Sequence, residues 1–154
     1  MTRSHKLSLF RAGLVLLAAT AGAPQPSHAG PAAGAAAGAL AGQSFVVSVA
    51  APAAKVGAPS ATTVTFKAAA GYHINLDFPT TLKLNLPAGV STPKADLKKA
   101  DAKVSKEEGS FQFPLTAASA GQKAIQGELR FAVCTETTCE PQRTAVTITL
   151  DVKP

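Results

Sequence analysis

Two cysteines, Cys134 and Cys139, are the residues of this sequence best suited to chemistry, and the chain contains no others. Four residues separate them, and the strand-like runs on either side predict that they flank the loop of a β-hairpin. Opposed hairpin positions lie about 5.5 Å apart, within reach of a disulfide. A bond near a hairpin tip is exposed to attack by an external thiolate. The placement favours redox chemistry, and the alternative is a structural disulfide that only stabilises the hairpin.

The sequence around the two cysteines is not that of a strongly activated thiol. Glu136 and Glu140 oppose thiolate formation, and no Lys, Arg or His adjoins either cysteine, Arg143 being four residues beyond Cys139. These neighbours predict a dithiol that passes on electrons from a partner, rather than an attacking oxidoreductase. The spacing differs from the two intervening residues of a thioredoxin motif, and no βαβ pattern surrounds it.

Metal binding is the other use of two cysteines. His73 is the one histidine beyond residue 29, so a four-ligand zinc site lacks donors, whereas two thiolates suit copper(I). We expect an ordinary half-buried His73 and keep copper(I) binding as a lesser alternative. A single histidine supports no Ser-His-Asp arrangement, and no Gly-rich phosphate loop is present. No cofactor is expected.

Residues 1–29 have the features of a secretory signal peptide. A region with three basic residues is followed by a short apolar region, and small residues lead to Ala29. The uncharged apolar run of about a dozen residues is shorter than the roughly 20 that span a bilayer. We therefore expect cleavage after Ala29, with Ala21 as the competing position. The expected product is periplasmic and has no membrane span.

The remaining chain predicts one domain preceded by a tether. Residues 30–42 are almost pure Ala, Gly and Pro, which is typical of a flexible segment, so the domain is expected over 43–154. Without the three basic residues of 1–29, the net charge of +6 falls to near +3. Lysines are spread along the domain rather than clustered, which argues against nucleic-acid binding and suits solvent-facing strand positions.

From residue 43 onward, the dominant pattern is one of apolar residues at every second position, which is typical of β-strands. Leu82, Leu84 and Leu86, for example, share one face of a strand, and Pro- and Gly-rich turns separate such runs. Pro114 must lie at a sheet edge or a non-bonding position. Several short strands at this spacing predict an all-β sandwich of two antiparallel sheets. The expected strands are 45–49, 62–68, 81–86, 111–115, 125–133 and 145–152.

The stretch 93–108 interrupts this pattern because it is rich in Lys, Ala and Asp and has few strand formers. We expect a charged surface loop or a short helix around 95–103. Long excursions between strands are often functional, and a solvated insertion is the alternative.

Three segments together resemble the N-terminal periplasmic domain of the DsbD family of thiol:disulfide interchange proteins, the DsbD alpha-like domain. The resemblance covers about residues 43–154. Its segments are 113–121 (FPLTAASAG), 70–75 (AGYHIN), and the pair Cys134 and Cys139 followed by Pro141 and a final strand.

The resemblance implies an immunoglobulin-like sandwich whose cysteine pair alternates between disulfide and dithiol. In that family the domain takes electrons from a thioredoxin-like domain and gives them to periplasmic oxidoreductases. Carried over here, Cys139 is the cysteine attacked in exchange, Cys134 is its resolving mate, and Tyr72 is an active-site aromatic. The expected protein is a monomeric interchange component or protein-disulfide reductase with thioredoxin-like periplasmic partners.

Two features depart from the best-known member of that family. Its cysteines are separated by five residues rather than four, and its cap loop over the cysteines carries a Phe. The corresponding stretch here, 94–109, has no aromatic residue. The alternative from another class is a non-catalytic immunoglobulin-like binding module with a structural hairpin disulfide.

Overall fold

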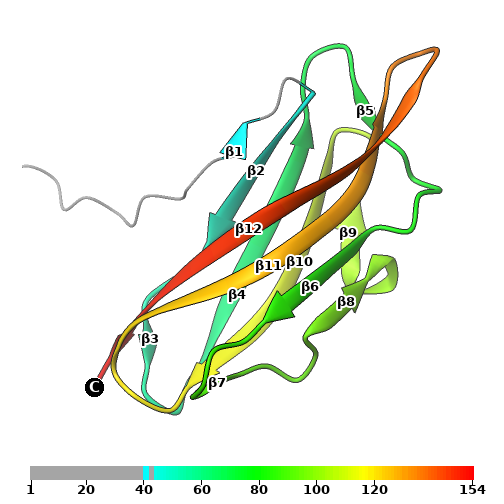
Figure 1. Cartoon of the computed structure of the whole chain (residues 1–154). Helices are drawn as coiled ribbons and strands as arrows, with labels where there is room; N and C mark the ends of the chain where they lie inside the picture. Colours follow the sequence, from blue (N-terminus) through cyan, green and yellow to red (C-terminus); the bar gives the residue numbers. More distant parts are fainter. Residues whose placement is uncertain (1–39, 42–43) are drawn as a thin grey trace, which may run out of the picture. The chain divides into compact units, whose positions relative to one another are not determined.

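Two β-sheets face each other in the computed structural model, which describes residues 40–41 and 44–154 (Figure 1). The first sheet contains β1 (Leu40–Ala41), β2 (Phe45–Ala50), β4 (Pro59–Ala68), β7 (Val90–Ser91), β9 (Ala102–Val104) and β10 (Glu108–Ala117). The second contains β3 (Ala54–Lys55), β5 (His73–Ile74), β6 (Thr81–Asn85), β8 (Asp96–Lys98), β11 (Gly121–Cys134) and β12 (Cys139–Lys153). The 3-10 turn η1 (Lys99–Asp101) lies between β8 and β9.

The strand order is that of an immunoglobulin-like sandwich. Among the six long strands, the first, second and fourth pair as β2-β4-β10, and the third, fifth and sixth pair as β6-β11-β12. Neighbours within these sets are antiparallel. The short strand β9 extends the first sheet beside β10, and β8 extends the second beside β6. The predicted all-β, immunoglobulin-like antiparallel sandwich is therefore confirmed.

Alternating apolar residues fill the space between the sheets. All six predicted strands are present, and the structure lengthens most of them. Three phenylalanines, Phe66, Phe111 and Phe131, are fully buried at the centre, with the ring centroids of Phe66 and Phe131 4.8 Å apart. Burial of such rings is the main stabilising contribution to the sandwich. This core fixes the β11–β12 hairpin that carries both cysteines.

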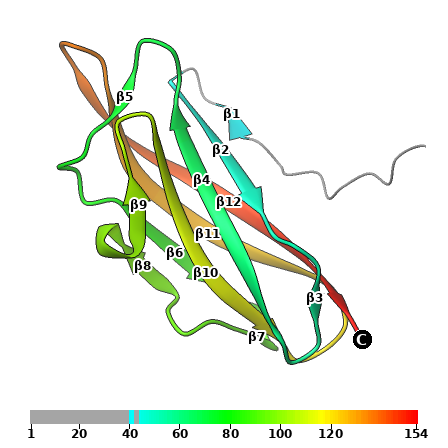
Figure 2. The ribbon, with the colours of Figure 1, turned by 180° about the vertical axis from the view of Figure 1, so that it is seen from behind.

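The prediction of a loop or helix for 93–108 is wrong. This stretch forms β8, η1 and β9, and it crosses from the second sheet to the first, as seen from behind in Figure 2. Pairing with the free sides of β6 and β10 outweighs the weak strand propensity of Lys, Ala and Asp. Buried Leu97 anchors β8 to the core, while the charged side chains face outward.

Pro114 occupies the kind of position that its missing N–H requires. On one side of β10, β9 pairs with 109–111 and β7 pairs with 116–117, so the residues between them have β4 alone as a neighbour. The predicted edge position of Pro114 is confirmed.

The predicted tether and leader fall mostly outside the described residues. The signal-peptide prediction for 1–29 lies entirely outside them. Within the predicted tether 30–42, Leu40 and Ala41 form β1 and pair with Val47 and Val46 of β2. In the part of the chain that the structure describes, no helix has the length and apolar character needed to cross a membrane.

Candidate functional site

A disulfide joins Cys134, the last residue of β11, to Cys139, the first residue of β12. The two residues are direct partners in the hairpin ladder, and their Cα atoms are 4.0 Å apart. Beyond them, the Thr135 N–H donates to the Thr138 carbonyl at 2.8 Å, which leaves Glu136 and Thr137 as the turn. Because bonded and non-bonded pairs alternate along a ladder, the cysteines occupy a non-hydrogen-bonded pair, where side chains are closest. The predicted hairpin disulfide is therefore present.

The two cysteines differ in their access to solvent. Cys134 is 3% exposed, whereas Cys139 lies in a run of exposed residues that starts at the turn. The reason is β5, which pairs with β11 on the side opposite β12, so that His73 lies against Cys134. Figure 1 shows β5 beside the tip of the β11–β12 hairpin. An external thiol therefore meets Cys139 first.

A hollow of about 300 Å³ opens beside the disulfide. It is formed by the segment that follows Tyr72 in the chain, together with one residue of the β9–β10 turn and the two cysteines. Its lining residues are His73, Ile74, Asn75, Leu76, Asp77, Lys106, Cys134 and Cys139. The hollow leaves open space beside the disulfide.

Asn75 connects this segment to the disulfide. Its side-chain Nδ2 donates to Cys139 Sγ across 3.7 Å, and its backbone N–H donates to the Ala132 carbonyl at 2.9 Å. Its Oδ1 accepts a hydrogen bond from the Asp77 N–H at 2.9 Å, which forms an Asx turn. No sequence pattern indicated the contact with Cys139, because the two residues are 64 positions apart.

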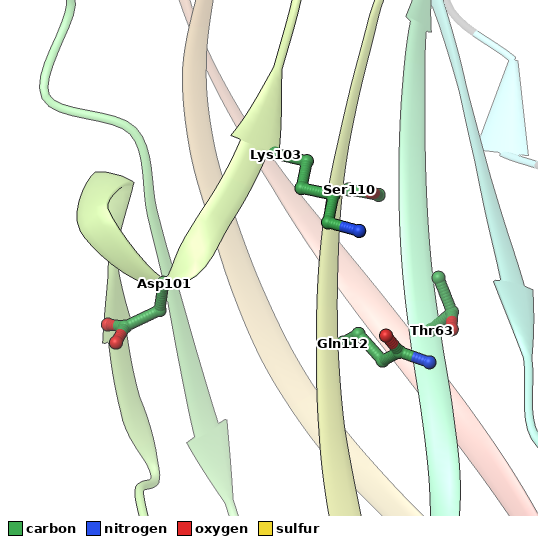
Figure 3. Close-up of a pocket in the computed structure, with 5 residues that line it drawn as sticks. All are labelled: Thr63, Asp101, Lys103, Ser110 and Gln112. Carbon is green, nitrogen blue, oxygen red and sulfur yellow. The ribbon is translucent and has the colours of Figure 1, made fainter.

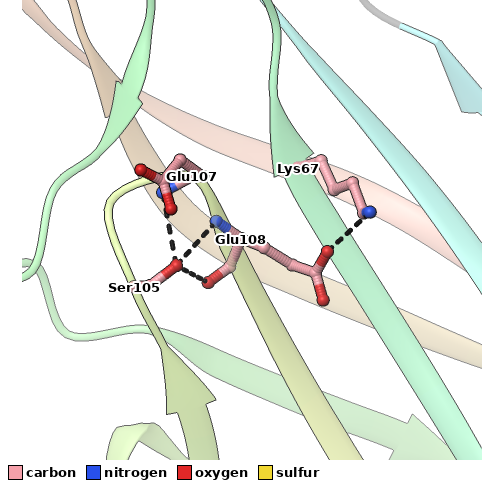
Figure 4. A network of polar contacts seen from close by, with 4 residues as sticks. All are labelled: Lys67, Ser105, Glu107 and Glu108. Atoms are coloured by element: carbon pink, nitrogen blue, oxygen red, sulfur yellow. Dashed lines mark hydrogen bonds and ion pairs between the residues drawn. The ribbon is translucent and has the colours of Figure 1, made fainter.

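The stretch 93–108, which forms β8, η1 and β9, also makes hydrogen bonds to the segment Ile74–Leu76 that lines the hollow. The Ile74 N–H donates to the Lys106 carbonyl at 2.6 Å, and Lys99 Nζ donates to the Leu76 carbonyl. The turn that carries Lys106 is itself ordered by Ser105, whose Oγ accepts from the Glu107 and Glu108 N–H groups (Figure 4). The stretch 93–108 thus holds both ends of the segment Ile74–Leu76 beside the disulfide.

Two ion pairs link charged side chains across neighbouring strands, one between β4 and β10 and the other between β11 and β12. Glu108 pairs with Lys67 at 2.7 Å and fixes the start of β10 next to the Ser105 turn (Figure 4). Arg143, which follows Cys139 in β12, pairs with Glu128 at 2.6 Å. This contact lowers the pKa of the Glu128 carboxyl and raises the pKa of Arg143. Arg143 is therefore engaged by Glu128, and Lys106 is the cationic residue that lines the hollow.

Tyr72, which the resemblance assigns to the active site, packs against the hydrophobic core and does not line the hollow. Its neighbours His73 and Asn75 line it instead. His73 is half-buried and pairs with Cys134 across the β5–β11 ladder. Among residues 40–41 and 44–154, no three His, Cys, Asp or Glu side chains form a group that could hold a metal ion.

A second hollow lies on the outer face of the first sheet, over β4, β9 and β10 (Figure 3). It measures about 320 Å³ and is lined by Thr63, Asp101, Lys103, Ser110 and Gln112. Lys94 Nζ donates to Asp101 Oδ1 at 2.7 Å, and the Lys98 N–H donates to Oδ2 at 2.8 Å, so the pKa of this carboxyl is lowered. This carboxylate is already paired, and the hollow contains no nucleophile comparable to a thiol.

No family model matches the chain, and no curated protein matches it. Among solved structures, the chain is similar to the GAE domain of GGA2p from Saccharomyces cerevisiae, with 9% identity over 73% of this chain and 97% of that one, at a TM-score of 0.44. It is also similar to AggA, the major subunit of aggregative adherence fimbriae type I from Escherichia coli. That match has 12% identity over 71% and 95% of the two chains, at a TM-score of 0.37. At these identities and TM-scores the likeness says nothing about binding or catalysis, and the fold assignment rests on the strand order.

Proposed function

We propose that this protein is a thiol–disulfide interchange protein of the periplasm, which relays electrons between a thioredoxin-like reductant and exported thiol proteins. The observation that carries the proposal is the asymmetry of the disulfide. Cys139 is exposed at a hairpin tip and borders a hollow of about 300 Å³, whereas Cys134 is buried behind it. Exposed disulfides have higher reduction potentials and are the labile ones, whereas structural disulfides of secreted proteins resist reduction.

The reductive half of the exchange starts at Cys139. A thiolate of the partner's dithiol attacks Cys139 Sγ, a partner–Cys139 disulfide forms, and the bond to Cys134 breaks. Cys134 leaves as a thiolate and takes up a proton. The partner's second thiolate then attacks the partner sulfur of the mixed disulfide and releases Cys139, which is also protonated. The partner dithiol is oxidised to a disulfide, and the Cys134–Cys139 pair gains two electrons and two protons.

Single-cysteine variants test the assignment of the attacked sulfur. Cys134→Ser and Cys139→Ser are each converted to the mixed disulfide with thionitrobenzoate, and labelling is quantified by mass. Each is then mixed with a thioredoxin whose second active-site cysteine is serine. We expect Cys134→Ser to release thionitrobenzoate and form a covalent one-to-one complex, because its remaining sulfur is accessible. The same complex should be at least about tenfold slower to form with Cys139→Ser. Equal capture by both variants would contradict the proposal.

One observation favours a second function, that of a non-catalytic binding module with a structural disulfide. No residue from Cys139 to Ala145 of β12 is buried, so the disulfide is the only covalent tie in a part of the hairpin that the core does not hold. Under this reading, replacement of both cysteines by alanine lowers stability and leaves partner binding intact.

A further inference from the structure

The amide of Asn75 is aimed at the exposed sulfur of the disulfide. Its Nδ2 lies 3.7 Å from Cys139 Sγ, within hydrogen-bonding range for sulfur. Asn75 itself is half-buried, and it lines the same hollow as both cysteines. The contact is with Cys139 and not with its buried mate, so any effect of the amide falls on one sulfur of the pair.

The orientation of this amide is determined by its other contacts. The Asp77 N–H is a donor and lies 2.9 Å from the far end of the amide, so the atom it meets must be the carbonyl Oδ1. Nδ2, the donor end, therefore faces the sulfur. The backbone N–H of Asn75 is tied to the Ala132 carbonyl at 2.9 Å, which fixes the residue to β11 two positions before Cys134. These anchors do not depend on the S–S bond, so the donor stays in place when the bond is reduced.

We propose that Asn75 is a catalytic residue of the exchange reaction, which stabilises the thiolate of Cys139 in the reduced protein and so makes Cys139 the attacking sulfur. This inference rests on the proposed interchange function. Hydrogen bonds donated to a charged group favour its charged form, and the thiolate is the nucleophile. Glu136 and Glu140, the charged residues on either side of Cys139 in the chain, oppose the thiolate, so a directed donor is needed to offset them. Among the other titratable residues that line the hollow, Lys106 adds a favourable charge and Asp77 an opposing one, while His73 pairs with Cys134 across the β5–β11 ladder.

The substrate of this step is a disulfide of an exported acceptor protein. The Cys139 thiolate attacks one acceptor sulfur, the acceptor S–S bond breaks, and its second sulfur leaves as a thiolate. The Cys134 thiolate then attacks Cys139 Sγ, which restores the Cys134–Cys139 disulfide and releases the first acceptor sulfur. Two electrons pass from the cysteine pair to the acceptor, and the protons lost by the two cysteines appear on its thiols.

Two substitutions at Asn75 distinguish the effect of the Nδ2 donor from the effect of the Asx turn. Asn75→Asp is nearly isosteric and keeps an oxygen for the Asp77 N–H, but it replaces the donor facing Cys139 by an acceptor. Asn75→Ser also keeps an acceptor for that N–H, is uncharged and is too short to reach the sulfur. Asn85→Asp is the matched control, because it makes the same charge change on exposed Asn85 of β6. Thermal unfolding of each oxidised variant establishes that it is folded.

The measured quantity is the rate at which iodoacetamide alkylates Cys139 in the reduced full chain as a function of pH, with the modified cysteine located by peptide mass. We expect Asn75→Asp to raise the thiol pKa of Cys139 by about one unit, which is about tenfold less thiolate at neutral pH. Asn75→Ser should raise it by a smaller amount, and Asn85→Asp should leave it unchanged. An unchanged pKa in both Asn75 variants, or faster alkylation of Cys134 than of Cys139 in the parent chain, would overturn the inference. Because iodoacetamide needs no protein partner, this failure is distinct from a failure of the interchange proposal.

Discussion

The two halves of β12 are held in the fold in different ways. From Val146 to Val152, every second residue is buried between the sheets, and Val146, Ile148, Leu150 and Val152 pack into the core. From Cys139 to Ala145, no residue is buried. This half is held by its ladder to β11, the Cys134–Cys139 disulfide and the ion pair between Arg143 and Glu128.

Because of this difference, the stability of the fold and the chemistry of the disulfide depend on different parts of β12. The core half determines whether the sandwich forms, because apolar burial is the dominant favourable contribution to folding. The tip half carries exposed Cys139 and contributes no buried residue to the space between the sheets. Such a region suits the reversible redox role that we propose for the disulfide, and the substitutions below act on the core or on the tip of the hairpin and its surroundings.

Phe66→Ala should have the largest effect on stability and none on the chemistry. Phe66 is fully buried and packs on Phe131 with 4.8 Å between ring centroids, so truncation leaves a cavity at the centre of the core. We expect a loss of about 3–5 kcal/mol in the free energy of unfolding, measured by urea denaturation. Leu76→Ala, on the exposed rim of the site, should change it by less than about 0.5 kcal/mol. A shift in the reduction potential of folded Phe66→Ala would show that core and tip are not separable.

Replacement of Cys134 and Cys139 together by alanine should have an intermediate effect on stability. The disulfide closes a short loop, so on the chain-entropy model its loss costs about 2 kcal/mol in urea denaturation. Reduction of the wild-type disulfide should produce the same loss without any substitution. Exchange with a thioredoxin-like dithiol should disappear entirely. A loss as large as that of Phe66→Ala would mean that the disulfide is part of the structural core of the hairpin.

Arg143→Gln should have the smallest effect and should depend on pH. Arg143 lowers the pKa of Glu128, so the ion pair contributes stability above the pKa that Glu128 has in the unfolded chain, and this contribution is lost as pH falls through its lowered folded value. In Arg143→Gln the carboxyl should titrate closer to its ordinary range, as followed by NMR of the Glu128 side chain. Arg143 is exposed and Glu128 is only partly buried, so neutral-pH stability should barely change. A Glu128 titration identical in both proteins would contradict the pairing.

The sequence was most informative where a repeating pattern extends over several residues. Alternation along 81–86 and 145–152 predicts strands, because every inward position in those runs is a large apolar residue. Strands of two or three residues, such as β5 and β9, are too short to show a period. The stretch 93–108 was mispredicted because its strands are stabilised by pairing partners distant in sequence, and single-sequence propensity does not register such partners.

The same limit applies to the site. The hairpin disulfide could be predicted, because both cysteines and both strands lie within one short segment. Asn75 could not, since its contact with Cys139 depends on the register of β5 against β11. The only local signal was the spacing of Asn75 and Asp77, which suits an Asx turn. The resemblance assigns Tyr72 to the site, whereas the hollow is lined by the residues that follow it.

We propose that the Cys134–Cys139 pair exchanges electrons and is not merely a structural disulfide. The most direct test of this proposal is the reduction potential of the purified protein, measured by equilibration with glutathione buffers and quantification of the two redox forms by alkylation and mass. An interchange protein should have a value between about −270 and −120 mV, the range of known exchange proteins. A value well below about −300 mV would contradict the claim and identify the disulfide as a structural one.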